Sequence, residues 1–472
     1  MSIDEPRAAP LAQPSPAVQR ASGATQPAAD KLLGALFSAR LDIVLALAVF
    51  ALAIAPRAAW IAYNDRPPQG LNDPTMYNFL ADIMADGGGY TRPTGEPFAY
   101  YPVGFPATVA GLKKATDLVG AERGIFEIKM MNGVFGAMTS VLLFLLATRL
   151  LNRRTGLAAG ALHAIFPSQV FYTGTILSEA EFTLLLVASL AILCWKPWSR
   201  DGMPYPQIFA AGLMFSAATM TRGITLALPL VLFGIWFFYL HSRKRALMQT
   251  LVVFAGVAVL IVPWSIRNSV QFGTLVGPST NLGDDLCIGN FNGSDGRFTL
   301  TGKCFEGTEG MTPKELEIHR NREGLRVAAE DLASDPLRIP GLVARKAYWL
   351  LYKDDDGLWA AESYGNDWFI SHPRREILAF AANGIYYATM AITLLGMAAF
   401  ALSRDVRRLL LTLTMLYVLA VPLAFFGDPR FHFPAMPFAI LIAAATIVML
   451  WDARWRTLAP LPELRPGSGG AR

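Results

Sequence analysis

Apolar residues fall in long blocks along this chain, separated by short polar turns and by two long polar segments. A helix needs about 20 mostly apolar residues to cross the hydrocarbon core of a bilayer. Blocks that approach this length lie at residues 41–62, 126–149, 157–176, 179–196, 205–221, 224–241, 247–265, 377–402, 408–426 and 433–451. The pattern predicts an all-α polytopic membrane protein with a bundle of about ten transmembrane helices.

The two long polar segments are residues 63–125 and 266–376. Within the first, residues 105–119 are apolar but too short to span a bilayer, and they carry a lysine pair, so they predict an interfacial helix. Within the second, residues 313–333 and 338–352 have helical character, and the segment is long enough for a small subdomain outside the membrane.

These boundaries predict five parts. They are a disordered N-terminal tail (1–36), a transmembrane module that includes the first polar segment (37–265), an extramembrane subdomain (266–376), the last transmembrane helices (377–452) and a C-terminal tail (453–472). The tail prediction rests on a first stretch that is rich in Ala, Pro, Ser and Gln without apolar periodicity.

Composition supports the membrane class. The chain is 53% hydrophobic and 16% charged, whereas soluble domains carry about 25% charged residues, so a soluble enzyme, a disordered protein and a secreted disulfide scaffold are disfavoured. The net charge of +5 does not indicate nucleic-acid binding, because the basic residues cluster in short loops between apolar blocks. By the positive-inside rule both termini are then cytoplasmic, and both long polar segments lie on the outer face.

The chain has three cysteines. Cys287 and Cys304 share the second polar segment, where an oxidising compartment makes a disulfide plausible; two unrelated free thiols are the alternative. Cys194 lies in an apolar block, and no Cys or His spacing indicates zinc. His432 is interpreted as a local hydrogen-bonding residue, so no metal ligand is assigned.

Polar and ionisable residues gather at the outer ends of the predicted helices. Such residues are costly inside a membrane, and several that face one cavity suggest a functional site. The set comprises Asp73, Tyr77, Tyr100, Tyr101, Glu179, Glu181, Arg222, Arg267, Asp428, Arg430 and His432.

Each candidate also has a purely structural interpretation. Asp73 precedes Pro74 and could cap a helix that starts there, and Glu179 could cap the helix that follows it. Arg222 could extend to the lipid headgroups, and Arg267 could anchor the interface beside an aromatic belt residue. Asp428 and Arg430 could simply neutralise each other.

Four motifs in chain order carry a family resemblance. Asp73 and Tyr77 open the first outer segment and residues 100–106 (YYPVGFP) close it, and the others are LSEAEF at 177–182, VPWSIRN at 262–268 and GDPRFHFP at 427–434. Together they resemble the integral-membrane GT-C glycosyltransferases. The nearest group is the bacterial family-39 type, related to protein O-mannosyltransferases and the lipid A aminoarabinose transferase, and the resemblance covers residues 40–450.

The resemblance implies an inverting glycosyltransferase of the bacterial inner membrane, with its active site on the periplasmic face. It implies a polyprenyl-phosphate-linked sugar donor and an acceptor that is a glycolipid, an envelope glycan such as lipopolysaccharide, or a protein. The position of Asp73 matches the catalytic base, and Glu179 matches a second acidic residue. Candidate substrate-binding residues are Tyr77, Tyr101, Arg222, Arg267, Asp428 and Arg430.

The sequence also departs from the family. Many relatives have paired acidic residues where Asp73 stands alone, and relatives of the aminoarabinose type carry a Lys where this chain has Tyr100 and Tyr101. Phosphate contacts are therefore expected from Arg92, Arg222, Arg267 or Arg430. Some GT-C enzymes use a divalent metal, but no ligand set is fixed here.

The residues suit transfer from a sugar phosphate. A phosphate leaves as a stable anion, so the chemistry needs one carboxylate to take the acceptor proton and cations to hold the phosphate. A carboxylate in a partly dry cavity is expected to have a raised pKa. The main alternative is a lipid or sugar transporter, a class that often shows internal repeats and charges near the bilayer midplane; this chain shows no repeat and its charges lie at one face.

Overall fold

A computed structural model describes residues 28–452. The predicted C-terminal tail and residues 1–27 of the predicted N-terminal tail lie outside this range. Residues 28–46, the first part of helix α2 (Ala28–Tyr63), form one unit, and residues 47–452 form another. The packing described below is that of the second unit. Its described residues are helical apart from turns and one isolated antiparallel bridge between Thr91 and Pro97, as the apolar pattern predicted.

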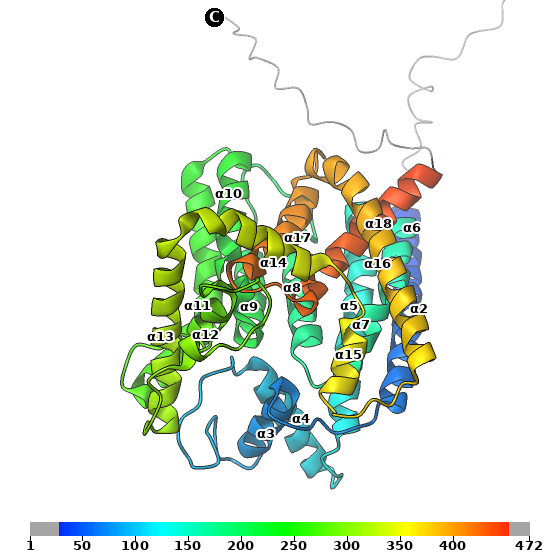
Figure 1. The fold of residues 1–472 in the computed structure, drawn as a ribbon. Helices are drawn as coiled ribbons and strands as arrows, with labels where there is room; N and C mark the ends of the chain where they lie inside the picture. Colours follow the sequence, from blue (N-terminus) through cyan, green and yellow to red (C-terminus); the bar gives the residue numbers. More distant parts are fainter. Residues whose placement is uncertain (1–27, 453–472) are drawn as a thin grey trace, which may run out of the picture. The chain divides into compact units, whose positions relative to one another are not determined.

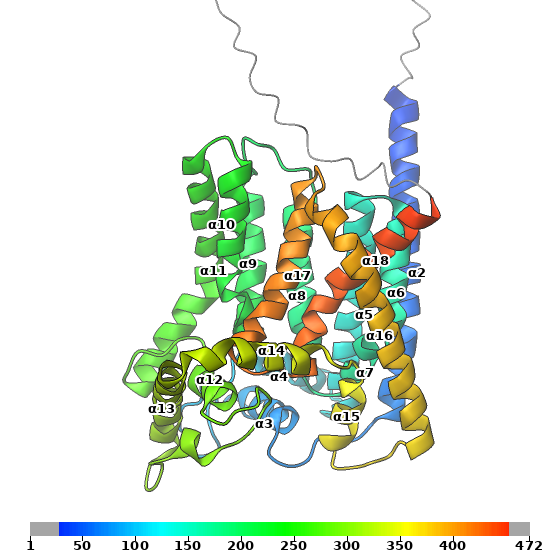
Figure 2. The ribbon, with the colours of Figure 1, turned by 45° about the horizontal axis from the view of Figure 1, so that its top comes forward.

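Long apolar helices run side by side through the molecule (Figures 1 and 2). Within residues 28–452, six stretches are long and apolar enough to cross a membrane. They lie in α2, α5 (Ile125–Leu150), α11 (Arg243–Phe272), α16 (His372–Ala401), α17 (Val406–Ala424) and a last stretch that joins η5 (Pro429–Ala435) to α18 (Met436–Trp451). Shorter helices lie among them: α6 (Arg153–Ile165), α8 (Glu179–Cys194), α9 (Tyr205–Thr221) and α10 (Leu228–Tyr239), the last preceded by η2 (Gly223–Ala227). The predicted count of ten spans stays a prediction.

The predicted span at residues 157–176 is not one helix. Helix α6 ends at Ile165, Phe166 is extended, and Pro167 starts the short helices α7 (Pro167–Phe171) and η1 (Tyr172–Gly174). The residue before a proline avoids the α-helical region for steric reasons, so the chain turns at this point and delivers α8 to the candidate site.

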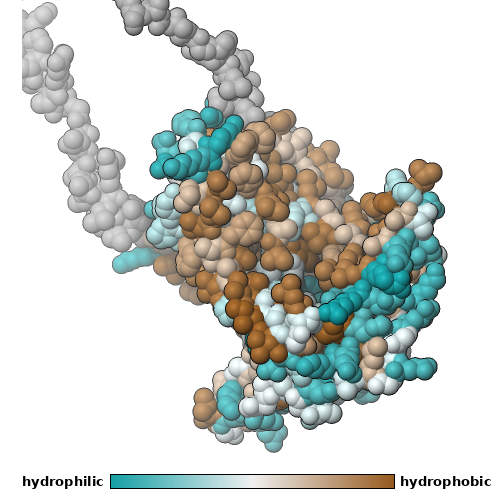
Figure 3. Space-filling model, turned by 90° about the vertical axis from the view of Figure 1, so that its left-hand side faces the viewer, coloured by the Kyte–Doolittle hydropathy of each residue, from teal (hydrophilic) through white to brown (hydrophobic). Residues whose placement is uncertain are grey.

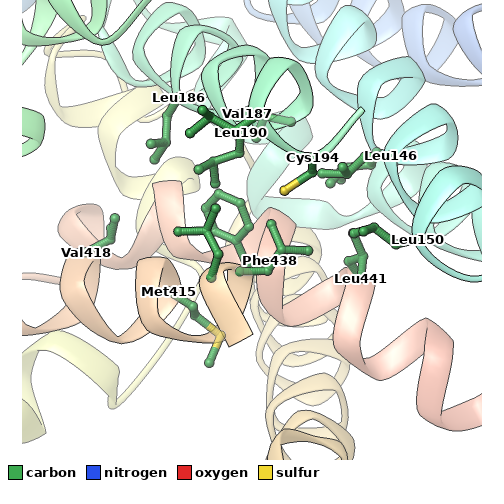
Figure 4. Packing of buried hydrophobic residues seen from close by; sticks show 14 of the residues in the cluster. Leu146, Leu150, Leu186, Val187, Leu190, Cys194, Met415, Val418, Phe438 and Leu441 are labelled. Carbon is green, nitrogen blue, oxygen red and sulfur yellow. The ribbon is translucent and has the colours of Figure 1, made fainter. Parts of the chain in front are cut away.

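The core of the bundle is built around α18. Of its membrane-spanning window 83% is buried, against 22–56% for the other five spans. Its Phe438 and Leu441 pack against residues of α5, α8 and α17 in one buried apolar cluster (Figure 4). At the contact of α9 with α11, a Cβ on Gly212 would lie 2.6 Å from the carbonyl oxygen of Val253. A small residue at this position lets the two backbones approach closely.

The polar segments carry the remaining helices, which gather at one end of the bundle (Figures 1 and 2). The predicted interfacial helix is α4 (Gly104–Leu118), and the two predicted helices of the second segment are α13 (Pro313–Ser334) and α14 (Ile339–Leu351). The others are α3 (Asp73–Ala85), α12 (Leu282–Asn290), α15 (Asp356–Ser363) and the short turns η3 (Gly302–Phe305) and η4 (Pro336–Arg338). On one side of the molecule, hydrophobic residues form a band between hydrophilic residues above and below (Figure 3).

A buried carboxylate joins the two polar segments. Glu317 of α13, which is 4% exposed, accepts the backbone N–H of Ala99 at 2.8 Å and the hydroxyl of Thr280 at 2.7 Å. The Arg92 guanidinium pairs with its other oxygen at 2.7 Å. Both long segments therefore lie at the same end of the bundle, as the charge pattern predicted.

Cys287 of α12 and Cys304 of η3 form a disulfide, the first of the two alternatives that the sequence left open. Both residues are fully buried against Val327 of α13. The bond therefore fastens η3 to the helix that carries Asp284 and Asp285.

Loss of this disulfide should loosen the part of the second polar segment that carries α12 and η3. The cysteines are 17 residues apart, and closing a loop of this size contributes about 3 kcal/mol to the free energy of unfolding. The double variant Cys287→Ser/Cys304→Ser should show a lower melting temperature and faster hydrogen exchange of α12 amides. Cys194→Ala, which removes the free thiol, is the control; unchanged exchange in α12 would contradict the expectation.

Candidate functional site

The first candidate residue, Asp73, does not cap its helix. The cap of α3 is Asn72, whose side-chain oxygen accepts the N–H of Thr75 at 3.2 Å. Asp73 is the first helical residue, and Pro74, which needs no hydrogen-bond partner for its nitrogen, follows it. Because Asn72 takes the capping role, the Asp73 carboxylate is available to the site.

Arg430 joins the two acidic candidates. Its Nη1 donates to Asp73 Oδ2 at 2.6 Å, and its Nε donates to Glu179 Oε1. The backbone N–H of Arg430 donates to Asp428 Oδ1 at 2.9 Å, so Asp428 caps η5 and does not neutralise the guanidinium. Residues from three distant parts of the chain thus meet at one cation.

Arg222 completes the cluster from a fourth element. It follows the last residue of α9, and its Nη1 donates to Glu179 Oε1 at 2.6 Å and to the Ser178 hydroxyl at 3.2 Å. It therefore faces Glu179 and does not extend to headgroups. We call Asp73, Glu179, Arg222 and Arg430 the charge cluster; two carboxylates and two guanidinium groups balance each other.

Two tyrosines support Asp73. The Tyr101 hydroxyl donates to Asp73 Oδ1 at 2.8 Å, so both carboxylate oxygens have a partner. The ring of Tyr77 packs edge-on against Tyr101, with centroids 4.9 Å apart, and against Phe105 at 5.3 Å. Tyr77 therefore fixes the position of the Tyr101 ring, and the Tyr101 hydroxyl in turn fixes the Asp73 carboxylate.

The expected rise in the pKa of Asp73 is not found. Burial raises the pKa, but the positive charge of Arg430 and hydrogen bonds from Arg430 and Tyr101 outweigh it, and the pKa lies below the ordinary value of 3.8. A partly dry cavity raises a carboxyl pKa only where no cation pairs with it. Asp73 is thus ionised across the physiological pH range.

The two carboxylates differ in access. The Asp73 side chain is 29% exposed, whereas that of Glu179 is 1% exposed. Glu179 Oε2 is buried and has no hydrogen-bond partner among the residues that the structure describes. An unsatisfied buried acceptor costs about 1–3 kcal/mol, which a hydroxyl or N–H donor from a bound molecule would recover.

Other arginine candidates lie elsewhere. Arg267 donates to the backbone carbonyls of Tyr90 at 2.6 Å and Phe98 at 3.1 Å, so it holds the first polar segment in place. Arg92 pairs with Glu317. Of the four arginines expected to contact phosphate, the structure brings Arg222 and Arg430 to the charge cluster.

Three consecutive aspartates, residues 354–356, lie beside the site and had no role in the sequence prediction. The Tyr172 hydroxyl donates to Asp356 Oδ2 at 2.9 Å. Burial and the negative charge of Asp356 raise the pKa of Asp428 to about 6. His432 contacts Asp354 Oδ1 at 2.8 Å, in agreement with a local hydrogen-bonding role. Their position directly after an apolar helix was the feature of the sequence that could have indicated their place beside the site.

A second omission is the acidic pair at the start of α12. Burial and the negative charges of Asp284 and Asp73 raise the pKa of Asp285 to about 7, so Asp285 lies within electrostatic range of the site. Asp284 forms an ion pair with Arg320 of α13. The two adjacent carboxylates in the second polar segment were visible in the sequence. Because they are more than 200 residues from Asp73 along the chain, the sequence did not indicate that they lie near it.

No group of three or more His, Cys, Asp or Glu side chains is placed to hold a metal ion in the part of the chain that the structure describes. The charge cluster has two carboxylates, and both are engaged by arginine.

Comparison with known proteins extends the picture. A family model described as dolichyl-phosphate-mannose-protein mannosyltransferase matches residues 112–266. No curated protein matches the chain in sequence.

Several solved structures share the fold. The oligosaccharyltransferase AglB from Archaeoglobus fulgidus, in complex with an inhibitory peptide and a dolichol-phosphate, is 16% identical with a TM-score of 0.50 over 88% of this chain and 51% of that one. An Archaeoglobus fulgidus oligosaccharyltransferase tethered to an acceptor peptide is 14% identical with a TM-score of 0.50, over 86% of this chain and 50% of that one. This chain thus spans about half the length of these relatives.

A further match is ArnT from Cupriavidus metallidurans in the apo state, 15% identical with a TM-score of 0.39 over 88% of this chain and 77% of that one. The family match over residues 112–266 and the fold shared with AglB confirm the resemblance to the GT-C glycosyltransferases.

Proposed function

We propose that this protein is an inverting glycosyltransferase that moves a sugar from a polyprenyl-phosphate-linked donor to an acceptor at the outer face of the membrane. The observation that carries the proposal is the accessible, ionised Asp73 carboxylate beside two arginines. The family description and the dolichol-phosphate bound to AglB support a lipid-phosphate donor.

The first step is deprotonation of the acceptor. Asp73 takes the proton of an acceptor hydroxyl as its oxygen attacks the anomeric carbon from the face opposite the phosphate, which inverts the configuration. General-base catalysis of this kind contributes about 10²–10⁴-fold. The low pKa of Asp73 makes it a weak base that is always in the correct ionisation state, and Tyr101 fixes its orientation.

The bond from the anomeric carbon to the phosphate oxygen breaks in the same step, and the lipid phosphate leaves as an anion. Arg430 uses Nη1 and Nε for the two carboxylates, and the Nη2 hydrogens remain for a phosphate oxygen. A guanidinium offers five N–H donors, so one arginine can bridge carboxylate and phosphate. Glu179, which is sealed from solvent, keeps Arg222 and Arg430 together.

The acceptor that we favour is a glycolipid or envelope glycan such as lipopolysaccharide, with protein as the alternative. The first test uses the purified wild-type chain, a panel of radiolabelled polyprenyl-phosphate sugars and total envelope lipid. Transfer of label with inverted anomeric configuration supports the proposal. In proteoliposomes, label that crosses the bilayer while still attached to its lipid would indicate a flippase and overturn it.

A further inference from the structure

A groove lies at the end of the bundle opposite the charge cluster. Helix α8 starts at Glu179 and has 16 residues, so its far end is about 24 Å away along the helix axis. There, residues of α5, α8 and α9 line an open groove of about 450 Å³, within the range of about 300–1,000 Å³ found for small-molecule sites. Its lining residues are Leu142, Ala188, Ala191, Ile192, Trp195, Lys196 and Gln207.

The wall of this groove is apolar. Ala188 and Ala191 lie one turn apart on α8, and their small side chains leave room between the aliphatic groups of Leu142 and Ile192. The one amide in the wall is already engaged, because Gln207 Nε2 donates to the carbonyl oxygen of Ile192 at 2.6 Å. The wall thus suits a hydrocarbon chain.

The mouth of the groove is cationic. Lys196 lines it and is exposed, and the Arg149 guanidinium lies over the Trp195 ring at 4.4 Å from the centroid. Within residues 28–452, no ion pair joins Arg149 or Lys196 to a carboxylate. Trp195 is 39% exposed, as is common for tryptophan at a membrane–water interface.

An apolar wall that ends at two cations and an interfacial tryptophan matches one kind of molecule. Basic pockets between transmembrane helices bind anionic lipid headgroups, and the wall offers a place for an acyl chain. We propose that this groove binds one anionic phospholipid, with an acyl chain along Ala188 and Ala191 and its phosphate against Arg149 and Lys196. The site is remote from the charge cluster and does not depend on glycosyl transfer.

Trp195 provides a direct readout. The full chain is placed in phosphatidylcholine nanodiscs, and phosphatidylglycerol or additional phosphatidylcholine with brominated acyl chains is titrated in. The chain has 10 tryptophans, so the fluorescence quenching that belongs to Trp195 is obtained by subtracting the quenching of Trp195→Phe from that of the wild type. One basic side chain contributes about fivefold to binding of an anionic lipid, so half-maximal quenching should need on the order of tenfold less phosphatidylglycerol than phosphatidylcholine.

Three variants test the proposed contacts. Arg149→Gln and Lys196→Gln should each reduce the preference several-fold, and Ala188→Phe should fill the groove and weaken quenching by both lipids. Lys244→Gln, which removes an exposed cation that lines a different cavity at this end, is the matched control and should change nothing. Equal quenching by the two brominated lipids, or a preference unaffected by Arg149→Gln and Lys196→Gln, would show ordinary annular lipid and overturn the proposal.

Discussion

Replacement of Asp73 by Asn is expected to lower glycosyl transfer by about 10²–10⁴-fold, the usual contribution of a positioned general base. The amide is nearly isosteric and can still accept a hydrogen bond, but it cannot take a proton. Binding of the donor should change little, because Arg222 and Arg430 remain. The measurement is transfer of radiolabel under saturating donor, together with the donor dissociation constant.

Asp86→Asn is the matched control for this variant. Asp86 follows the last residue of the same helix, its side chain is 65% exposed, and it pairs with Arg123 at 2.8 Å. This change should leave transfer within about twofold of the wild type, since exposed ion pairs contribute little. If Asp73→Asn transfers as fast as the wild type, Asp73 is not the base, and Glu179 becomes the next residue to test.

Replacement of Arg430 by Gln is expected to change both the rate and its pH dependence. Arg430 lowers the pKa of Asp73 below 3.8 against the effect of burial. Without the guanidinium, the effect of burial remains, and the pKa rises. Asp73 then binds a proton at pH values where it is ionised in the wild type, so the acidic limb of the rate profile should move to higher pH. Loss of the phosphate contact should lower the rate at neutral pH as well.

The Arg430→Gln variant should also be less stable. Removing one partner of a buried ion pair costs about 3–5 kcal/mol, and Arg222 limits the cost here because it still pairs with Glu179.

The variant Arg430→Lys distinguishes the effect of the positive charge from that of the guanidinium geometry. It keeps the positive charge, so the acidic limb should stay close to that of the wild type, but an ammonium group lacks the planar fork that contacts both carboxylates. An unchanged pH profile in Arg430→Gln would contradict the electrostatic argument.

The residues of the charge cluster could be found from the sequence because charged residues are rare beside membrane-spanning segments. Charged side chains at the ends of apolar blocks are costly to bury, so Glu179, Arg222 and Arg430 stand out although they are far apart in the chain. Asp73 lies in the polar segment 63–125 and was found from the motif that it shares with Tyr77. Their pairing could not be found in this way. The sequence left open that Arg430 neutralises Asp428, two residues away, but Arg430 reaches Asp73 and Glu179, and Asp428 caps the turn.

The direction of the pKa shift illustrates the same limit. Burial alone predicts a raised pKa for Asp73, and this inference from the sequence was wrong because it omitted the partner. Whether a buried carboxyl is neutral or ionised depends on a cation within about 4–6 Å, and that cation comes from residue 430. Likewise Arg267, which resembled a phosphate ligand, holds the backbone at Tyr90 and Phe98.

The sequence by itself determined the all-helical membrane class, the polar segments, the disulfide candidates and the family resemblance. These follow from hydrophobic block length, charge placement and short motifs, which are local properties of the chain. The tertiary structure alone decided where the arginines point, that Asn72 and not Asp73 caps α3, and that Asp285 lies near the site. These features depend on contacts between residues that are hundreds of positions apart, and local pattern carries no information about which distant side chain completes an ion pair.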